Sequence, residues 1–383
     1  MSLDDSSRQA LRDLAQALAD DYASSAAVRA VLDQHGTPDK TLDAELARAG
    51  LFGIEIPERF GGAGAGFAEL ALVVETLGTH TAPSRLTASA VLCAGAFLLG
   101  GSAEQRSRWL PGLADGSSAG TAVLGGFGPA RRAPDAGPAE SGVRAERRGD
   151  GWTLHGTVGY VLDARDADLM VVSTAGAAGE RAPDLPLVAV VPARTEGLTS
   201  DPVELVDGTR CADTVSFAGV QVPETDILAR GDAARQLTGA LANRAAVALA
   251  ADSVGAAQRL LDLTVAYLKQ REQFGRPIGS FQAVKHHAAD MLVNVETSAA
   301  LLDGAVREID ESPFSAELAS MAKEYCCERA AATAGTALQL HGGIGYTWEH
   351  DLHLYFKRVL LNQYLLGDGR WHRERVAARL ADQ

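Results

Sequence analysis

Residues 267–282 read YLKQREQFGRPIGSFQ, and this stretch decides how the second half of the chain is organised. Apolar residues at helical spacing lead into it, namely Leu261, Val265 and Leu268. Gly275 and Pro277 then interrupt the pattern before a second helical run begins. The sequence therefore predicts a corner between two long helices.

The side chains of this corner favour a particular kind of ligand. Arg271 is a planar cation that suits paired phosphate oxygens, and Gln282 can both donate and accept hydrogen bonds. Phe274 and Phe281 add flat apolar surfaces. Together they suit a large planar cofactor that carries phosphate, although an exposed arginine beside two core aromatics would give the same pattern.

Three motifs resemble one known family. The RxQFGRPIxxFQ pattern of residues 271–282 resembles the flavin-contact signature of the acyl-CoA dehydrogenases. The block LQLHGGIGYTWE at residues 338–349 follows it in the order expected for that family, and AGLFGIEIPERFGG at residues 49–62 is similar to a loop of the family's N-terminal domain. Two long matches in the right order make chance an unsatisfactory explanation.

The resemblance implies FAD as the cofactor and an acyl-CoA thioester as the substrate. It implies that the corner contacts the FAD of a neighbouring subunit, so we expect a homodimer or homotetramer, with a heteromer containing a related chain as the alternative. It also places Gln339, Gly342 and Gly343 at the adenosine-pyrophosphate end of the FAD, where the glycines allow the backbone to come close to the phosphates. Tyr160 is expected near the isoalloxazine, and the alternative is that it is a core aromatic residue. The residues expected to bind the cofactor are Arg271, Phe274, Phe281, Gln282, Gln339, Gly342, Gly343 and Tyr160.

The catalytic base is where this sequence departs from the family. Counting without gaps, the family's glutamate falls on Leu366, and the alternative position used by some relatives falls on Ala245. Neither side chain can take a proton. A small shift of register would bring Asp368 to the site, so we predict Asp368 as the catalytic base; the alternative is an aspartate that caps the helix starting near Arg370.

The pattern along the chain predicts an α+β fold in three parts. Helical periodicity dominates residues 1–119, short β-type runs separated by turn clusters dominate 120–230, and helical periodicity returns in 231–383. We therefore expect an N-terminal helical domain, a middle antiparallel β domain and a C-terminal helical bundle with four or more helices. One turn cluster is Arg148-Gly149-Asp150-Gly151.

Composition excludes several classes of protein. The net charge of -14 disfavours binding to nucleic acid, and no metal-ligand spacing is present. The longest apolar stretch, 88–99, is too short to span a bilayer, so we expect no membrane association. Four cysteines without a pairing pattern indicate a reducing compartment, and we expect a cytoplasmic protein.

These observations predict an FAD-dependent acyl-CoA dehydrogenase that passes electrons to an electron-transfer flavoprotein or a similar acceptor. The first alternative is the base-lacking subunit of a heteromeric dehydrogenase. The second, from another class, is a helical scaffold without flavin, because relatives carry a Thr-Glu-Pro turn where this chain has apolar residues and glycines at 123–130. Oxidase behaviour is a further possibility that the sequence leaves open.

Overall fold

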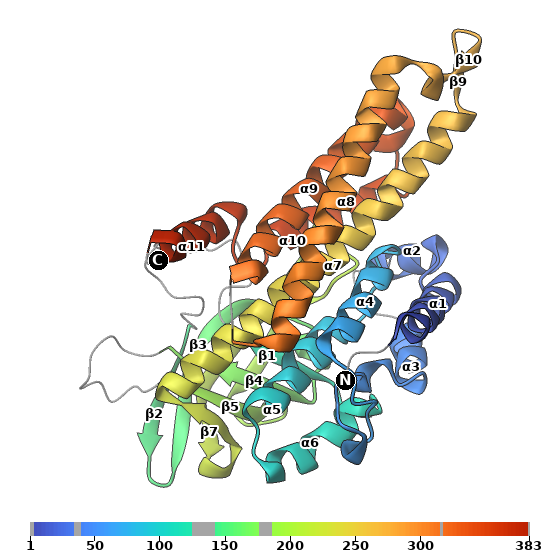
Figure 1. The fold of residues 1–383 in the computed structure, drawn as a ribbon. Coiled ribbons are helices and arrows are strands. Elements are labelled where there is room, and N and C mark those ends of the chain that lie inside the picture. Colours follow the sequence, from blue (N-terminus) through green and yellow to red (C-terminus); the bar gives the residue numbers. More distant parts are fainter. Residues whose placement is uncertain (1–3, 34–39, 125–141, 176–185, 315–316, 382–383) are drawn as a thin grey trace.

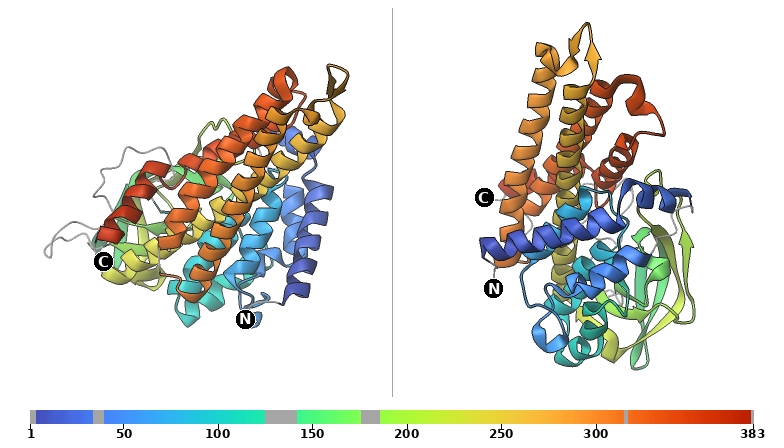
Figure 2. Two further views of the ribbon diagram at one scale, coloured as in Figure 1. Left: turned by 45° about the horizontal axis from the view of Figure 1, so that its top comes forward. Right: turned by 90° about the vertical axis from the view of Figure 1, so that its right-hand side faces the viewer.

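The computed structural model describes residues 4–33, 40–124, 142–175, 186–314 and 317–381. Helices at the start of the chain pack beside a pair of sheets, and a bundle of long helices extends away from both (Figure 1). Two further views show the hairpin of β9 and β10 at the far end of this bundle (Figure 2). We call that end the bundle tip; it comprises residues 271–282 and 339–348.

The first part of the chain is helical because apolar residues recur at helical spacing and polar residues cap the ends. The Asp4 carboxylate accepts a 2.8 Å hydrogen bond from the Ser7 N–H at the start of α1, and Ser102 with Gln105 forms a capping box before α6. The elements are α1 (Asp5–Tyr22), α2 (Ser25–Asp33), α3 (Lys40–Arg48), η1 (Leu51–Gly53), η2 (Glu58–Phe60), α4 (Phe67–Gly78), the π-helix η3 (Thr87–Ala94), α5 (Gly95–Gly100) and α6 (Ala103–Ala114).

The middle of the chain forms two four-stranded sheets. Their strand orders are β1-β4-β5-β8 and β2-β3-β7-β6. All pairings are antiparallel except β1 with β4, which is parallel and departs from the expected antiparallel pattern. The strands are β1 (Gly120–Val123), β2 (Val143–Arg148), β3 (Gly151–Leu162), β4 (Leu169–Ser173), β5 (Leu187–Pro192), β6 (Leu198–Pro202), β7 (Ala212–Pro223) and β8 (Ile227–Arg230), with the short helices η4 (Ala164–Asp166) and η5 (Glu224–Asp226).

The last part of the chain is the helical bundle. Helices α7 (Gly231–Gln270), α8 (Gln282–Glu311), α9 (Glu317–His341) and α10 (Leu352–Tyr364) pack together, and α11 (Gly369–Ala381) lies on α9. The predicted corner is confirmed: α7 ends at Gln270, and α8 begins at Gln282 after β9 (Glu272–Gln273), β10 (Arg276–Pro277) and η6 (Ile278–Ser280). The 3₁₀-helix η7 (Gly342–Tyr346) follows α9.

Three groups of buried apolar side chains hold these parts together. One joins the N-terminal helices to the bundle, one lies between the two sheets, and one joins η3, α5, α6, the first half of α7 and residues 365–366 to the sheets. We call the third group the reaction-end cluster. The α+β class is confirmed, whereas the division into domains at 119 and 230 stays a prediction, although β1 begins at Gly120 and α7 at Gly231.

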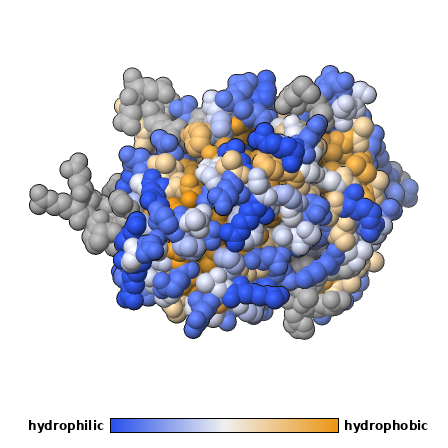
Figure 3. Space-filling view, turned by 90° about the horizontal axis from the view of Figure 1, so that it is seen from below, coloured by the Kyte–Doolittle hydropathy of each residue, from blue (hydrophilic) through white to orange (hydrophobic). Residues whose placement is uncertain are grey.

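The outer surface is mixed in character. On the face seen from below, hydrophilic residues are spread widely and hydrophobic residues show between them (Figure 3). Among the described residues, no helix combines the length and the apolar character needed to cross a membrane.

Candidate functional site

The bundle tip holds most of the residues predicted to bind the cofactor. The Arg271 N–H donates to the Tyr267 carbonyl at 2.8 Å and so ends α7, while its side chain is exposed and has no partner among the described residues. Phe274 is 94% exposed and has a left-handed φ of 55°. Its ring meets Phe281 edge-on at 6.1 Å, and Arg276 lies 4.1 Å from the centre of the Phe281 ring.

The backbone of Phe274 is strained, because a residue other than glycine costs about 1–3 kcal/mol in the left-handed region of φ and ψ. Nothing in the described part of the chain covers Phe274. The tip therefore has the properties of a surface that is completed by another molecule.

The second predicted group lies at the same tip. Gln339 is exposed at the end of α9, and Gly342 has a left-handed φ of 61° that favours glycine. A side chain placed at Gly342 or Gly343 would meet no atom within 4 Å, so this backbone is open to a ligand. The His341 ring stacks on Tyr267 at 4.4 Å, one turn before Arg271, and joins the two groups. The structure thus brings together motifs separated by about 70 residues in the sequence.

Tyr160 and Asp368, the remaining predicted residues, lie away from the tip. Tyr160, in β3, has a φ of 61° and packs on the reaction-end cluster. That cluster also contains Ala245 on α7 and Leu366 after α10, which are 0% and 8% exposed. Both positions at which the sequence comparison with the family placed a base therefore lie in one apolar cluster.

Asp368 is exposed at the start of α11. Its carboxylate accepts a 2.9 Å hydrogen bond from the Trp371 N–H, which is the geometry of a helix N-cap. Its own carbonyl accepts from the His372 N–H at 3.1 Å. The capping role considered from the sequence is therefore present in the structure, and the role of base stays a prediction.

A buried polar network holds α10 in place, and sequence reasoning did not predict it. Arg358 pairs with Asp207 at 3.0 Å and with Asp252 at 3.1 Å. The Asn362 amide donates to Asp252 at 2.6 Å. Although burial opposes ionisation, Arg210 and Arg358 lower the pKa of Asp252. The network ties α10 to α7 and to the loop after β6, which places the turn that carries Leu366.

Lys323 is a second buried residue that sequence reasoning missed. It lies on α9 among apolar positions such as Ala319, Ala322 and Cys326, and that spacing was the available signal that it faces inward. Its ammonium donates to the carbonyls of Gln363 and Gly367, both at 3.2 Å. Burial lowers the pKa of Lys323.

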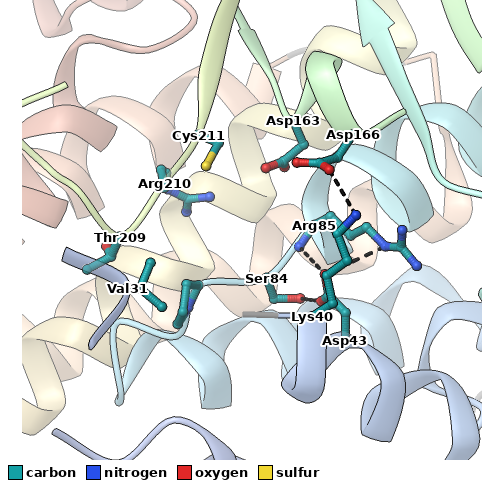
Figure 4. A pocket seen from close by; sticks show the side chains of 11 residues that line it. Val31, Lys40, Asp43, Ser84, Arg85, Asp163, Asp166, Thr209, Arg210 and Cys211 are labelled. Atoms are coloured by element: carbon teal, nitrogen blue, oxygen red, sulfur yellow. Dashed lines mark hydrogen bonds and ion pairs between the residues drawn. The ribbon is translucent and has the colours of Figure 1, made fainter. Parts of the chain in front are cut away.

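A small charged cavity of about 30 Å³ lies where the N-terminal helices face the sheets (Figure 4). Asp163 and Asp166 point into it from one side, and Lys40 pairs with Asp166 at 3.0 Å. Burial, and then the negative charge of Asp43, raise the pKa of Asp163 to about 7. The volume suits a water molecule rather than a substrate.

Comparisons with known proteins agree with this geometry. The family models "Acyl-CoA dehydrogenase, N-terminal domain" and "Acyl-CoA dehydrogenase, C-terminal domain" match residues 5–117 and 234–381. Acyl-CoA dehydrogenase IpdE2 of Mycolicibacterium smegmatis is 33% identical over 374 residues, which cover 97% of this chain and 98% of that protein.

Two solved structures have the same fold over the whole chain. One is a variant of the Tcur3481-Tcur3483 steroid ACAD, with a TM-score of 0.86, 33% identity and coverage of 98% of each chain. The other is the ChsE4-ChsE5 complex from Mycobacterium tuberculosis, with a TM-score of 0.86, 26% identity and coverage of 100% of this chain and 99% of that one.

The fold and these relatives define a flavoprotein oxidoreductase that acts on CH–CH bonds. The chain belongs to the acyl-CoA dehydrogenase family, and its function is FAD-dependent acyl-CoA dehydrogenation. The predicted family, cofactor and enzyme class are confirmed, the lack of the usual catalytic glutamate stays a prediction, and the scaffold without flavin is not favoured. The glycine-rich segment that replaces the Thr-Glu-Pro turn lies largely outside the described residues, which end at Leu124 and resume at Gly142.

Proposed function

We propose that this chain dehydrogenates an acyl-CoA thioester within an oligomer in which the bundle tip of one chain completes the FAD site of another. The observation that carries this proposal is the exposure of Arg271 and Phe274, neither of which is covered by the described part of its own chain. A homodimer or homotetramer satisfies it, and so does a heteromer with a related chain.

When bound, FAD accepts the hydride that leaves the β-carbon of the acyl group. The residues of this chain fit the dinucleotide in three ways. Arg271 supplies a bidentate cation for phosphate, the backbone at Gly342 and Gly343 allows close approach, and Phe274 offers a flat apolar face. Tyr160, at the other end, is the aromatic residue proposed to lie near the isoalloxazine.

The α-proton needs a base, and we propose Asp368 for this role. Its carboxylate is exposed, lies two residues from Leu366, and is flanked by Gly367 and Gly369, whose freedom lets the turn adjust. The carboxylate would have to leave the Trp371 N–H when it takes the proton, which costs about 1 kcal/mol for a lost N-cap.

A second candidate is favoured by the burial of Leu366 and Ala245 in one apolar cluster. In this reading, the chain is the base-lacking subunit of a heteromeric dehydrogenase, and the site of a related chain removes the proton. The similarity to the ChsE4-ChsE5 complex supports this candidate.

The substrate class, acceptor and location are parts of the same proposal. Because one relative is described as a steroid ACAD, a polycyclic acyl-CoA belongs beside straight-chain and branched thioesters among the candidate substrates. Electron-transfer flavoprotein or a similar acceptor would reoxidise the flavin. The four cysteines are buried and form no disulfide in the described part of the chain, which supports the proposed cytoplasmic location.

The test begins with the purified chain, measured by light scattering together with its FAD content. We expect a dimer or larger species with bound FAD, followed by bleaching of the flavin during anaerobic titration with a panel of straight-chain, branched and polycyclic acyl-CoA thioesters. A monomer that retains FAD at micromolar concentration would contradict the shared site. An oligomer that bleaches only after a related chain is added would select the heteromer.

A further inference from the structure

A buried cation lies beneath the turn that follows α10. Lys323 is 1% exposed, although lysine rarely lies inside a protein without a partner. Its ammonium donates to the Gln363 carbonyl in the last turn of α10 and to the Gly367 carbonyl on the far side of the turn, both at 3.2 Å. The cation therefore bridges the two ends of residues 363–367.

The backbone of this turn adopts unfavourable angles and needs contacts from other segments to keep them. Leu366 and Gly367 both have left-handed φ angles, of 61° and 101°, and for leucine this region is unfavourable. The Leu361 carbonyl accepts from the Leu365 N–H at 3.1 Å, but the last carbonyls of a helix have no following turn to bond to. On its other side the turn rests on Trp371, because a side chain at Gly367 would come within 2.6 Å of that indole.

The turn also decides which side chain reaches the reaction-end cluster. Leu366 packs in the same cluster as Ala245 and Tyr160, while Asp368, two residues later, caps α11 outside it. A turn that relaxed toward the ordinary right-handed region would move both residues. The two hydrogen bonds from Lys323 thus connect α9 directly to the turn that carries Leu366.

We propose that Lys323 is a positioning residue, which fixes residues 365–368 so that residue 366 enters the reaction-end cluster. It acts by donating hydrogen bonds to two carbonyls and does not touch the substrate. Its consequence for the reaction rests on the proposed function, whereas its effect on the turn does not.

The effect on the turn is measured by hydrogen exchange in the FAD-loaded protein. In Lys323→Met, which keeps the length of the side chain but removes its donors, we expect amides in a peptide spanning 363–372 to exchange about 10-fold faster. Lys323→Gln, which keeps a donor, should recover part of the protection. Lys357→Met, which removes a lysine from α10 that lies 4.9 Å from the Trp348 ring, is the matched control and should leave this peptide unchanged.

Two results overturn the proposal at this stage. One is unchanged exchange in 363–372 in Lys323→Met, and the other is an equal rise in exchange throughout α7, α9 and α10, which would make Lys323 a general fold residue.

The effect of Lys323 on the reaction is measured in a Leu366→Glu variant. In this variant the turn carries a carboxylate at the position where the resemblance places the family's glutamate. Adding Lys323→Met should slow single-turnover flavin reduction by about 10- to 100-fold, because a misplacement of about 1 Å has an effect of this size, with the Kd for acyl-CoA unchanged within about twofold. Equal rates with and without Lys323→Met overturn the positioning role. If neither the parent nor Leu366→Glu reduces flavin with any acyl-CoA, the proposed function fails, and the exchange measurement still decides the role of Lys323 in the turn.

Discussion

The bundle tip and the reaction-end cluster carry the two halves of the predicted site, and they differ in almost every physical property. The tip exposes Arg271 and Phe274, which the described part of the chain leaves uncovered, while Leu366 and Ala245 are buried in apolar surroundings. Exposure without a partner indicates a surface made for another chain. An apolar side chain buried at this place cannot act as a base. The base must then be another residue of this chain, such as Asp368, or a residue of a related chain.

The difference also concerns how each region is held. The tip is held by the short β9–β10 hairpin and by the stacking of Tyr267 on His341, which joins the end of α7 to the end of α9. The reaction end depends on Arg358, Asp252 and Lys323, which come from α10, α7 and α9. A substitution at the tip should therefore act on cofactor affinity alone, and one at the reaction end should act on the rate.

The largest expected effect separates the two roles of Asp368. Asp368→Asn keeps an oxygen that can accept from the Trp371 N–H, so the cap should survive. If Asp368 is the base, as we propose, flavin reduction should slow by about 100- to 10,000-fold while FAD content and acyl-CoA affinity stay unchanged. Stopped-flow reduction of the bound flavin measures this rate.

The Asp368→Asn variant also allows a control experiment. Adding Leu366→Glu to Asp368→Asn should restore part of the rate, and Leu366→Gln, which has the same shape without a basic group, should not. Reduction at the parent rate in Asp368→Asn would make Asp368 a helix cap only. The apolar reaction end would then favour the heteromer.

The next effect tests the tip. Arg271→Ala should weaken FAD binding by about 1.5 to 3 kcal/mol, the contribution of a charged bidentate contact, while the helices remain formed. FAD content after dialysis, together with circular dichroism, measures both. Lys269→Ala, which removes an exposed charge at the end of α7, is the control and should keep its FAD. Full occupancy of Arg271→Ala at dilute FAD would mean that the tip does not contact the phosphates.

Sequence reasoning succeeded where the signal is local. The interruption at Gly275 and Pro277 predicted the corner between α7 and α8. The residues 148–151 predicted a turn, and the structure has the turn between β2 and β3 there, where Gly149 has a φ of 59°. In both places the backbone itself demands those residue types. The two tip motifs lie together in the structure because each is short and continuous, and their binding to FAD stays a prediction.

It failed where partners come from distant segments. Arg358 meets Asp207 and Asp252 only because the fold brings three segments together, and no local pattern marks such a network. Asp368 shows a different limit. An aspartate before a helix satisfies the rule for an N-cap and the requirement for a base equally well, so the residue type could not decide between them.

The smallest effect tests whether a charged group near the reaction end lowers the stability of the fold, in contrast to the solvated charged groups of the tip. Tyr160 in β3 belongs to the reaction end, and Asp163 follows three residues later, with a pKa raised to about 7. A raised pKa means that folded Asp163 keeps its proton when the unfolded chain has lost it. Stability therefore falls as pH rises from about 4 to about 7 and stays lower above that range. The charged groups around it are Asp43, Asp166, Asp213 and Arg210, with Lys40 and Arg85 also at the cavity.

Asp163→Asn removes this cost, and asparagine tolerates the left-handed φ of 52° at this position. We expect the variant to exceed the parent by about 1 to 2 kcal/mol in free energy of unfolding at pH 8, a value reduced from the full linkage because the cavity admits water. The advantage should be small near pH 4 and should vanish below about pH 3, where the parent carboxyl is protonated in both states. Urea titrations at pH 4, 6 and 8 measure the trend, and Asp166→Asn, which removes the partner of Lys40, should not reproduce it. An equal difference at all three pH values would show that Asp163 stays ionised in the folded protein, and the contrast between a solvated tip and a costly interior would lose its titratable evidence.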